Sequence, residues 1–98
     1  MLKSVLNCIT CEGNRKFGNH STETNRKLNG DLVQTCKYHD NTICLINWTI
    51  KVVYLDNCGW NTSSTNRVLN DYKRYFQENH PTFTIIDSRE QKTFKKMN

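Results

Sequence analysis

The 98 residues of this chain include 36% hydrophobic and 10% aromatic side chains, enough for one modest core but not for two. We therefore expect residues 1–98 to form a single domain. The formal net charge is +5, with the basic excess near the two ends of the chain, which suits an acidic partner such as nucleic acid. No apolar run is long enough to span a membrane and no secretory signal is seen, so we expect a cytoplasmic protein.

The first part of the chain, residues 1–18, shows the weakest pattern. Val5, Leu6 and Ile9 predict a short strand, followed by a polar loop. Nothing else in this segment indicates how it joins the rest of the domain.

A hairpin is predicted around Asn29-Gly30, which lies between two runs, Thr24–Leu28 and Leu32–Tyr38. The Asn-Gly pair is the strongest short hairpin signal because both residues tolerate positive φ. These two runs therefore predict a pair of antiparallel strands.

Two more strands are predicted in the middle of the chain. Asp40-Asn41 provides a turn into Thr42–Ile46, whose continuous apolar character is typical of a strand buried on both faces. Asn47-Trp48 predicts a further turn into Thr49–Leu55. Together with the preceding hairpin, these segments predict an antiparallel meander.

A helix is predicted after residue 62, because five apolar residues recur on one side at a period of 3.6. They are Val68, Leu69, Tyr72, Tyr75 and Phe76. The hydroxyl residues at 62–65 offer several N-caps, and Pro81 ends the helix because proline cannot continue it.

Beyond the helix, Thr82–Ile86 predicts a strand, Asp87–Glu90 a turn and Gln91–Lys95 a weak edge strand. The expected fold class is α+β: an antiparallel β-meander, one amphipathic helix packed on the sheet and a C-terminal hairpin.

Two segments carry a pattern that resembles a group of small uncharacterised phage and mobile-element proteins. The first is His39-x-x-Thr42-Ile43, and the second is Cys58-Gly59-Trp60-x-Thr62-x-x-Thr65-x-x-x-Leu69-Asn70. The resemblance covers roughly residues 37–86, and Ser64 stands where the group usually has a threonine. It implies a phage-type origin and the fold of this region. It carries no assigned activity.

Four possible metal ligands occur as two pairs, Cys8-x-x-Cys11 and Cys36-x-x-His39. Together they match a tetrahedral zinc site of the Cys3His type, which would tie the N-terminal segment to the first hairpin. The alternative is that the cysteines are small buried hydrophobes. Five cysteines are an odd number, which argues against a complete disulfide framework.

The start of the predicted helix is compatible with two interpretations. Its hydroxyl groups can cap the helix, with Thr62 or Ser63 as N-cap and Thr65 supporting the first turn. Alternatively, a phosphate can bind there, and the residues that would hold it are Thr62, Ser64, Thr65, Asn66 and Arg67. Capping is the preferred interpretation.

The sequence contains no recognisable catalytic signature, so we expect a binding protein and not an enzyme. Trp48, at a predicted hairpin tip, is the expected aromatic anchor for a partner, whereas Trp60 is expected in the core. Four further cations complete the candidate interaction residues: Lys73, Arg74, Lys95 and Lys96. The expected partner is a host nucleic-acid-handling or defence nucleoprotein complex, which the protein would inhibit in the manner of an anti-CRISPR protein. The alternative is nonspecific binding of DNA or RNA.

Overall fold

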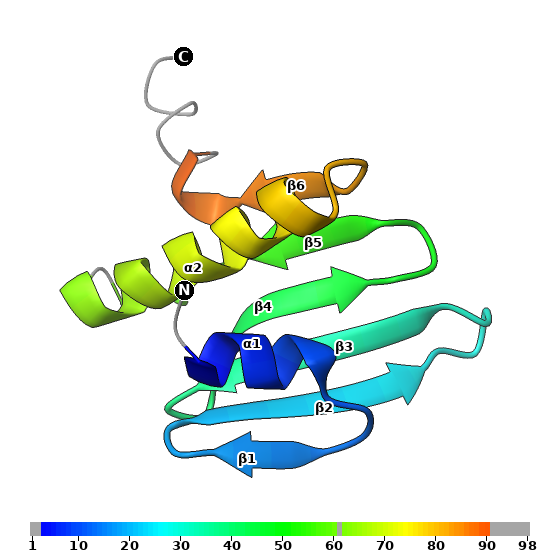
Figure 1. Cartoon of the computed structure of the whole chain (residues 1–98), viewed down its shortest axis with the longest axis horizontal. Helices are drawn as coiled ribbons and strands as arrows, with labels where there is room; N and C mark the ends of the chain where they lie inside the picture. The colour runs from blue at the N-terminus through cyan, green and yellow to red at the C-terminus, as the bar shows by residue number, and fades with distance from the viewer. Residues whose placement is uncertain (1–2, 61, 91–98) are drawn as a thin grey trace.

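The computed structural model describes residues 3–60 and 62–90. Within these residues the helices and strands follow the order α1 Lys3–Thr10, β1 Arg15–Phe17, β2 His20–Arg26, β3 Leu32–Tyr38, β4 Asn41–Asn47, β5 Val52–Leu55, α2 Ser63–Asn79 and β6 Thr84–Asp87. The described strands form one sheet in the order β1-β2-β3-β4-β5-β6. Both helices lie on the same face of this sheet (Figure 1). The predicted α+β fold, with a meander and a helix packed on the sheet, is confirmed.

The first hairpin forms where the Asn-Gly pair predicts it. Strands β2 and β3 pair antiparallel, with Arg26 opposite Leu32 at the turn. Gly30 has φ 93°, a conformation that glycine adopts without steric cost. The first five strands are all joined by antiparallel pairing, which gives the meander.

The prediction of a strand near the N-terminus is wrong, because Lys3–Thr10 is the helix α1. Its buried residues Val5, Cys8 and Ile9 are spaced i, i+3 and i+4, which is the period of a helix and not of a strand. Leu6, which suggested a strand, is exposed. Helix α1 packs over β1 and β2 and contacts α2.

The turn before β5 is longer than predicted. The side-chain oxygen of Asn47 accepts hydrogen bonds from the backbone N–H groups of Thr49 and Ile50, at 3.1 and 3.2 Å. Lys51 then has φ 59°, so the backbone re-enters the sheet only at Val52. Residues 49–51 are therefore turn and not strand.

The chain returns to the sheet after α2 in a way that the sequence did not indicate. Strand β6 pairs with β5 in parallel, with Val53 opposite Ile85, because α2 crosses the sheet before the chain re-enters it. The predicted turn after this strand is instead helical at residues 88–90. The predicted second strand of the C-terminal hairpin, Gln91–Lys95, lies outside the described residues.

The core lies between the sheet and the two helices. It is formed by Val5, Cys8, Ile9, Cys36, Ile43, Cys44, Ile46, Val53, Leu55, Val68, Leu69, Tyr72 and Phe76. The apolar stripe of α2 thus faces the sheet as predicted, with Tyr75 half-buried beside it. At the end of β6, buried Asp87 pairs with Arg89 at 2.7 Å and with Lys73 of α2 at 3.9 Å, which ties the helix to the last strand.

Candidate functional site

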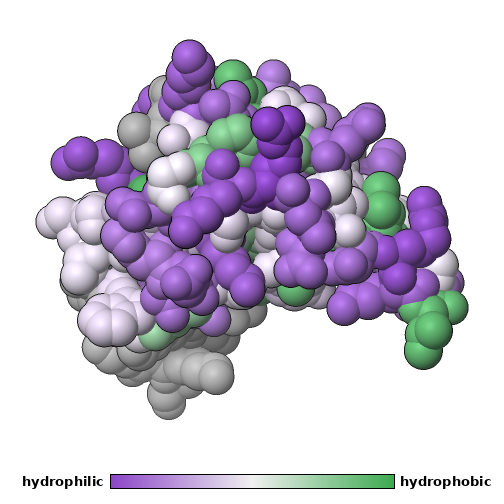
Figure 2. Space-filling view, turned by 90° about the horizontal axis from the view of Figure 1, so that it is seen from below, coloured by the Kyte–Doolittle hydropathy of each residue, from purple (hydrophilic) through white to green (hydrophobic). Residues whose placement is uncertain are grey.

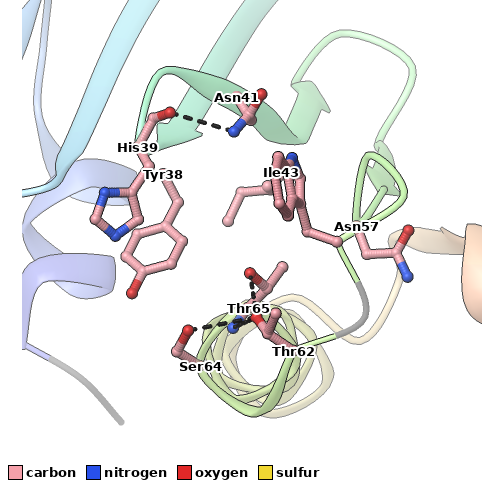
Figure 3. Close-up of a pocket in the computed structure, with 9 residues that line it drawn as sticks. Tyr38, His39, Asn41, Ile43, Asn57, Thr62, Ser64 and Thr65 are labelled. Atoms are coloured by element: carbon pink, nitrogen blue, oxygen red, sulfur yellow. Dashed lines mark hydrogen bonds between the residues drawn. The ribbon is translucent and has the colours of Figure 1, made fainter.

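A groove of about 340 Å³ separates the β3–β4 turn from the start of α2. Its lining residues come from that turn, from the loop after β5 and from the first turn of the helix: Tyr38, His39, Asn41, Ile43, Asn57, Trp60, Thr62, Ser64 and Thr65. In Figure 3 the first three lie across the opening from Thr62, Ser64 and Thr65, while Asn57 borders a third side. We call this the α2 groove.

The turn side of the groove is built from a tight β3–β4 connection. His39 and Asp40 have φ 51° and 65°, left-handed conformations that few residues other than glycine adopt. The backbone N–H of His39 donates to Asn19 O at 2.9 Å, and Asn41 Nδ2 donates to His39 O at 3.2 Å. These bonds fix the turn, so His39 and Asn41 are presented to the groove by a defined backbone.

The loop after β5 presents the groove's tryptophan. Asp56 Oδ1 accepts from Cys58 N at 2.9 Å, and Asn57 Oδ1 accepts from Gly59 N at 3.0 Å. The backbone N–H of Trp60 then donates to Asn57 O at 2.8 Å. Trp60 is 57% exposed, so the prediction that it belongs to the core is wrong. The loop holds its backbone at the groove, outside the space between sheet and helices.

The helix side of the groove supports the capping interpretation. Thr62 is the N-cap of α2, and its Oγ1 accepts a hydrogen bond from Thr65 N at 3.3 Å. The same hydroxyl contacts Thr65 Oγ1 at 3.0 Å and Ser64 Oγ at 3.4 Å. Capping by Thr62, with support from Thr65, is therefore confirmed.

The lining of the α2 groove carries hydroxyl, amide and aromatic groups but no lysine, arginine, aspartate or glutamate. Arg67 is exposed one turn along α2 and does not line it. The described residues therefore place no lysine or arginine inside the groove to balance a phosphate.

Three aromatic rings cluster at the end of β3, in edge-on and tilted contacts. Tyr38 lies 4.3 Å from the His39 ring and 4.9 Å from the His20 ring, measured between centroids. Burial, and then the nearby His39, lower the pKa of His20, so this buried ring stays neutral over a wider pH range than a free histidine. Its Nδ1 is buried without a hydrogen-bond partner.

Trp48, the predicted partner anchor, is not in the groove. It is half-buried against the core, 5.5 Å from the rings of His80 and Phe83 and 5.8 Å from that of Phe76. Its Nε1 donates to Gln34 Oε1 at 3.0 Å, deep in the sheet. The turn of residues 48–51 folds this indole inward, so the prediction of an exposed anchor at Trp48 is wrong.

The other predicted interaction residues are scattered. Lys73 pairs with Glu90 as well as with Asp87, and Asn66 accepts from Arg89 Nη1 at 3.5 Å. Arg74 is exposed on α2. Lys95 and Lys96 lie outside the described residues. Of the predicted set, the structure places Thr62, Ser64 and Thr65 in the α2 groove.

The predicted zinc ligands Cys8, Cys11, Cys36 and His39 do not form a metal site. No group of three or more histidine, cysteine or acidic side chains within residues 3–60 and 62–90 is arranged to hold a metal ion. Cys8 and Cys36 are buried in the core, Cys11 follows α1, and His39 lines the groove. Burial, with a smaller effect of Cys36, raises the pKa of Cys8 to about 12, so this thiol stays protonated.

Sequence reasoning missed Tyr38, Asn41 and Asn57, which complete the groove. The signal for this region was the pair of segments singled out in the sequence, His39–Ile43 and Cys58–Asn70, because both contribute to the lining. His39 and Ile43 come from the first segment, and Trp60, Thr62 and Thr65 from the second. Parts of both segments thus line one groove, although Leu69 and Asn70 of the second segment do not.

Neither described helix is long and apolar enough to cross a membrane. Comparison of the chain with protein-family models, with curated proteins and with solved structures gives no match in any of the three. What can be concluded about its role therefore comes from the α2 groove and from the surfaces around it.

Proposed function

We propose that this chain is a non-enzymatic, phage-type binding protein that acts in the cytoplasm of a host cell. Its target is a host nucleic-acid-handling or defence nucleoprotein complex, which it inhibits in an anti-CRISPR-like manner. The observation that supports this proposal is the α2 groove, where an exposed tryptophan stands beside uncharged hydrogen-bonding groups.

The groove has the properties of a protein-binding hot spot. Trp60 offers a large apolar surface, and tryptophan is among the residues enriched where interfaces gain most of their binding energy. Asn41 and Asn57 can bond the backbone of a bound segment, and Ile43 provides an apolar floor. About 340 Å³ is room for one or two side chains of a partner. The absence of lysine and arginine from the described lining favours such a segment over a phosphate.

The hydroxyl groups at the groove support binding over catalysis. Thr62 Oγ1 is held by the backbone N–H of Thr65 and by two neighbouring hydroxyls, so it serves the helix cap. A nucleophilic hydroxyl instead needs a base within hydrogen-bond reach. The partners of the Thr62 hydroxyl are a backbone N–H group and two other hydroxyls, and none of these is a base.

The test is a pull-down from host lysate with the tagged protein, with and without nuclease, comparing wild type with Trp60→Ala. The matched control is Ile50→Ala, since Ile50 is 55% exposed on the distant β4–β5 turn. We expect wild type and Ile50→Ala to retain a protein partner after nuclease treatment, and Trp60→Ala to lose it. Capture by Trp60→Ala equal to wild type would reject the groove as the contact.

Inhibition is tested separately, by expressing the protein in host cells that carry a nuclease-based defence system. We expect wild type and Ile50→Ala to restore plaque formation by a targeted phage, and Trp60→Ala to fail. Loss of restoration in all three would reject the inhibitory role.

A further inference from the structure

The sheet has a second face, opposite the helices, whose basic residues the proposed function does not use. Strand alternation places Thr22 and Cys36 toward the core, so their neighbours Ser21 and Lys37 point to the opposite face. Register places Lys16 of β1 opposite Ser21, and Ser21 opposite Lys37. Lys16, Ser21 and Lys37 therefore lie in one row across β1, β2 and β3. We call them the basic row.

The basic row borders a shallow depression of about 440 Å³. The depression is lined by Asn14, Arg15, Lys16, Ser21, Thr22, Glu23, Thr35 and Lys37. Neighbouring strands are about 4.8 Å apart, so the Cα atoms of Lys16 and Lys37 are separated by about 10 Å. Two lysines at this spacing can direct their ammonium groups at one anion above the hydroxyl of Ser21.

The charges around the depression favour an anion. Two cations, Lys16 and Lys37, and one acid, Glu23, lie on this face, whereas Arg15 lines the depression from a position opposite the core-facing Thr22. In the described part of the chain the ion pairs involve Lys73 and Arg89, so the cations of the depression are not neutralised by such pairs. Figure 2, which views the molecule from the β1 edge, shows mostly hydrophilic side chains along that edge.

An exposed aromatic residue shares this face. Thr35 lies opposite Leu45, and Leu45 opposite Tyr54, so Tyr54 is on the same face two strands from the depression. Tyr54 is 42% exposed. By strand spacing its Cα is about 10 Å from that of Thr35, a distance that one or two nucleotides of an extended strand can cover.

We propose that this face binds single-stranded nucleic acid. The basic row holds phosphates, and Tyr54 stacks a base. Known proteins that bind single strands on an open sheet combine the same two features. Basic side chains neutralise the phosphate backbone, and aromatic rings stack against exposed bases. A duplex hides its bases, so it gains nothing from Tyr54.

The test is fluorescence anisotropy with a labelled oligothymidylate, and with a duplex of the same length, over a series of salt concentrations. We compare wild type with the double variant Lys16→Glu/Lys37→Glu and with Arg74→Glu, which reverses one exposed cation on α2. The double variant should weaken oligothymidylate binding on the order of tenfold or more and reduce the salt slope by about 1.4, or 0.7 for each lost phosphate contact. Arg74→Glu should change binding much less.

The aromatic contribution is tested by Tyr54→Ala against Tyr54→Phe, which keeps the ring. Tyr54→Ala should weaken single-strand binding roughly five- to hundredfold, with little effect on the duplex. Thermal melts of all variants establish that they remain folded.

Three outcomes would overturn the proposal. The first is no oligothymidylate binding by wild type at low salt, and the second is equal binding by wild type and Lys16→Glu/Lys37→Glu. The third is competition by polyglutamate as effective as by unlabelled oligothymidylate, which would indicate an acidic protein partner. Trp60→Ala should bind oligothymidylate like wild type, because the α2 groove lies on the helix side of the sheet. Failure of this proposal therefore leaves the groove's pull-down result untouched.

Discussion

Replacing Thr62 by alanine removes the N-cap of α2 and tests how the start of this helix is held. Thr62 Oγ1 accepts from Thr65 N at 3.3 Å, and losing such a cap costs about 1 kcal/mol, within a range of roughly 0.5–2. Thr65 is buried at 7% exposure, and its Oγ1 also loses the partner 3.0 Å away. That loss adds about 0.5–1.5 kcal/mol.

The expected total for Thr62→Ala is therefore about 1–3.5 kcal/mol of unfolding free energy. In a domain of this size, 1 kcal/mol lowers Tm by about 4–8 °C. Urea denaturation followed by circular dichroism gives the free energy, and a thermal melt gives Tm. Thr62→Ser keeps the capping oxygen and should stay close to wild type.

A Thr62→Ala variant as stable as Thr62→Ser would refute this reasoning. If that same variant also failed to capture a partner, the Thr62 hydroxyl would be acting on a ligand and not on the helix. The anion-site interpretation of the helix start would then regain support.

Three further perturbations test other contacts. Trp48→Phe removes the N–H group that donates to Gln34 Oε1, and Gln34 is only 2% exposed. The variant should therefore lose about 1–3 kcal/mol of unfolding free energy, measured by urea denaturation. Burial raises the pKa of Asp87, but its bonds to Arg89 outweigh this effect and the net pKa is lowered. Its stabilisation should therefore hold above about pH 4 and fade below it, and Asp87→Asn should flatten that acid limb of a denaturation series. The pKa of His20 is lowered in the folded protein, so as the pH falls the unfolded chain binds a proton at this histidine before the folded protein does. The free energy of unfolding should therefore fall as the pH drops below about 6.5, and it should fall less in His20→Gln.

Local signals in the sequence predicted the elements that depend on local chemistry. Asn29-Gly30 specifies its hairpin through the backbone freedom of both residues, and the apolar stripe of α2 specifies which side faces the sheet. Thr62 could be named among the caps because a hydroxyl before an apolar stripe meets the unpaired N–H groups of a helix start.

The two tryptophans show where such reasoning stops. Trp48 begins the turn after Asn47, Trp60 follows the turn at Cys58-Gly59, and neither turn reveals on which side of the sheet the indole will lie. Trp48 is folded inward because Gln34 offers its side-chain oxygen from a neighbouring strand. Trp60 is left outside because the bonds of Asn57 hold its backbone at the groove. The position of each indole thus depends on its contacts in the folded structure, which local sequence patterns do not reveal.

The N-terminal helix and the last strand were missed for related reasons. Leu6 interrupts the helical spacing of Val5, Cys8 and Ile9, and eight residues are too few for a strong periodic signal. Strand β6 pairs in parallel with β5 because of where α2 ends after crossing the sheet. The zinc hypothesis failed because the spacing of its four residues does not reveal that Cys8 and Cys36 lie in the core while His39 lines the α2 groove.

The placement of the helices explains why two separate surfaces are available for the two proposed partners. A chain of this length covers one face of its sheet, so the strands must present side chains that tolerate water on the other. Strands β2 and β3 do this by alternation, with Thr22 and Cys36 inward and Ser21 and Lys37 outward. The α2 groove lies on the covered side, at the margin where helix and sheet diverge. A protein segment in the groove and a single strand on the basic row would therefore not compete. Contact of one surface with a component of a nucleoprotein complex would hold the other surface near the second component and so raise its effective concentration there.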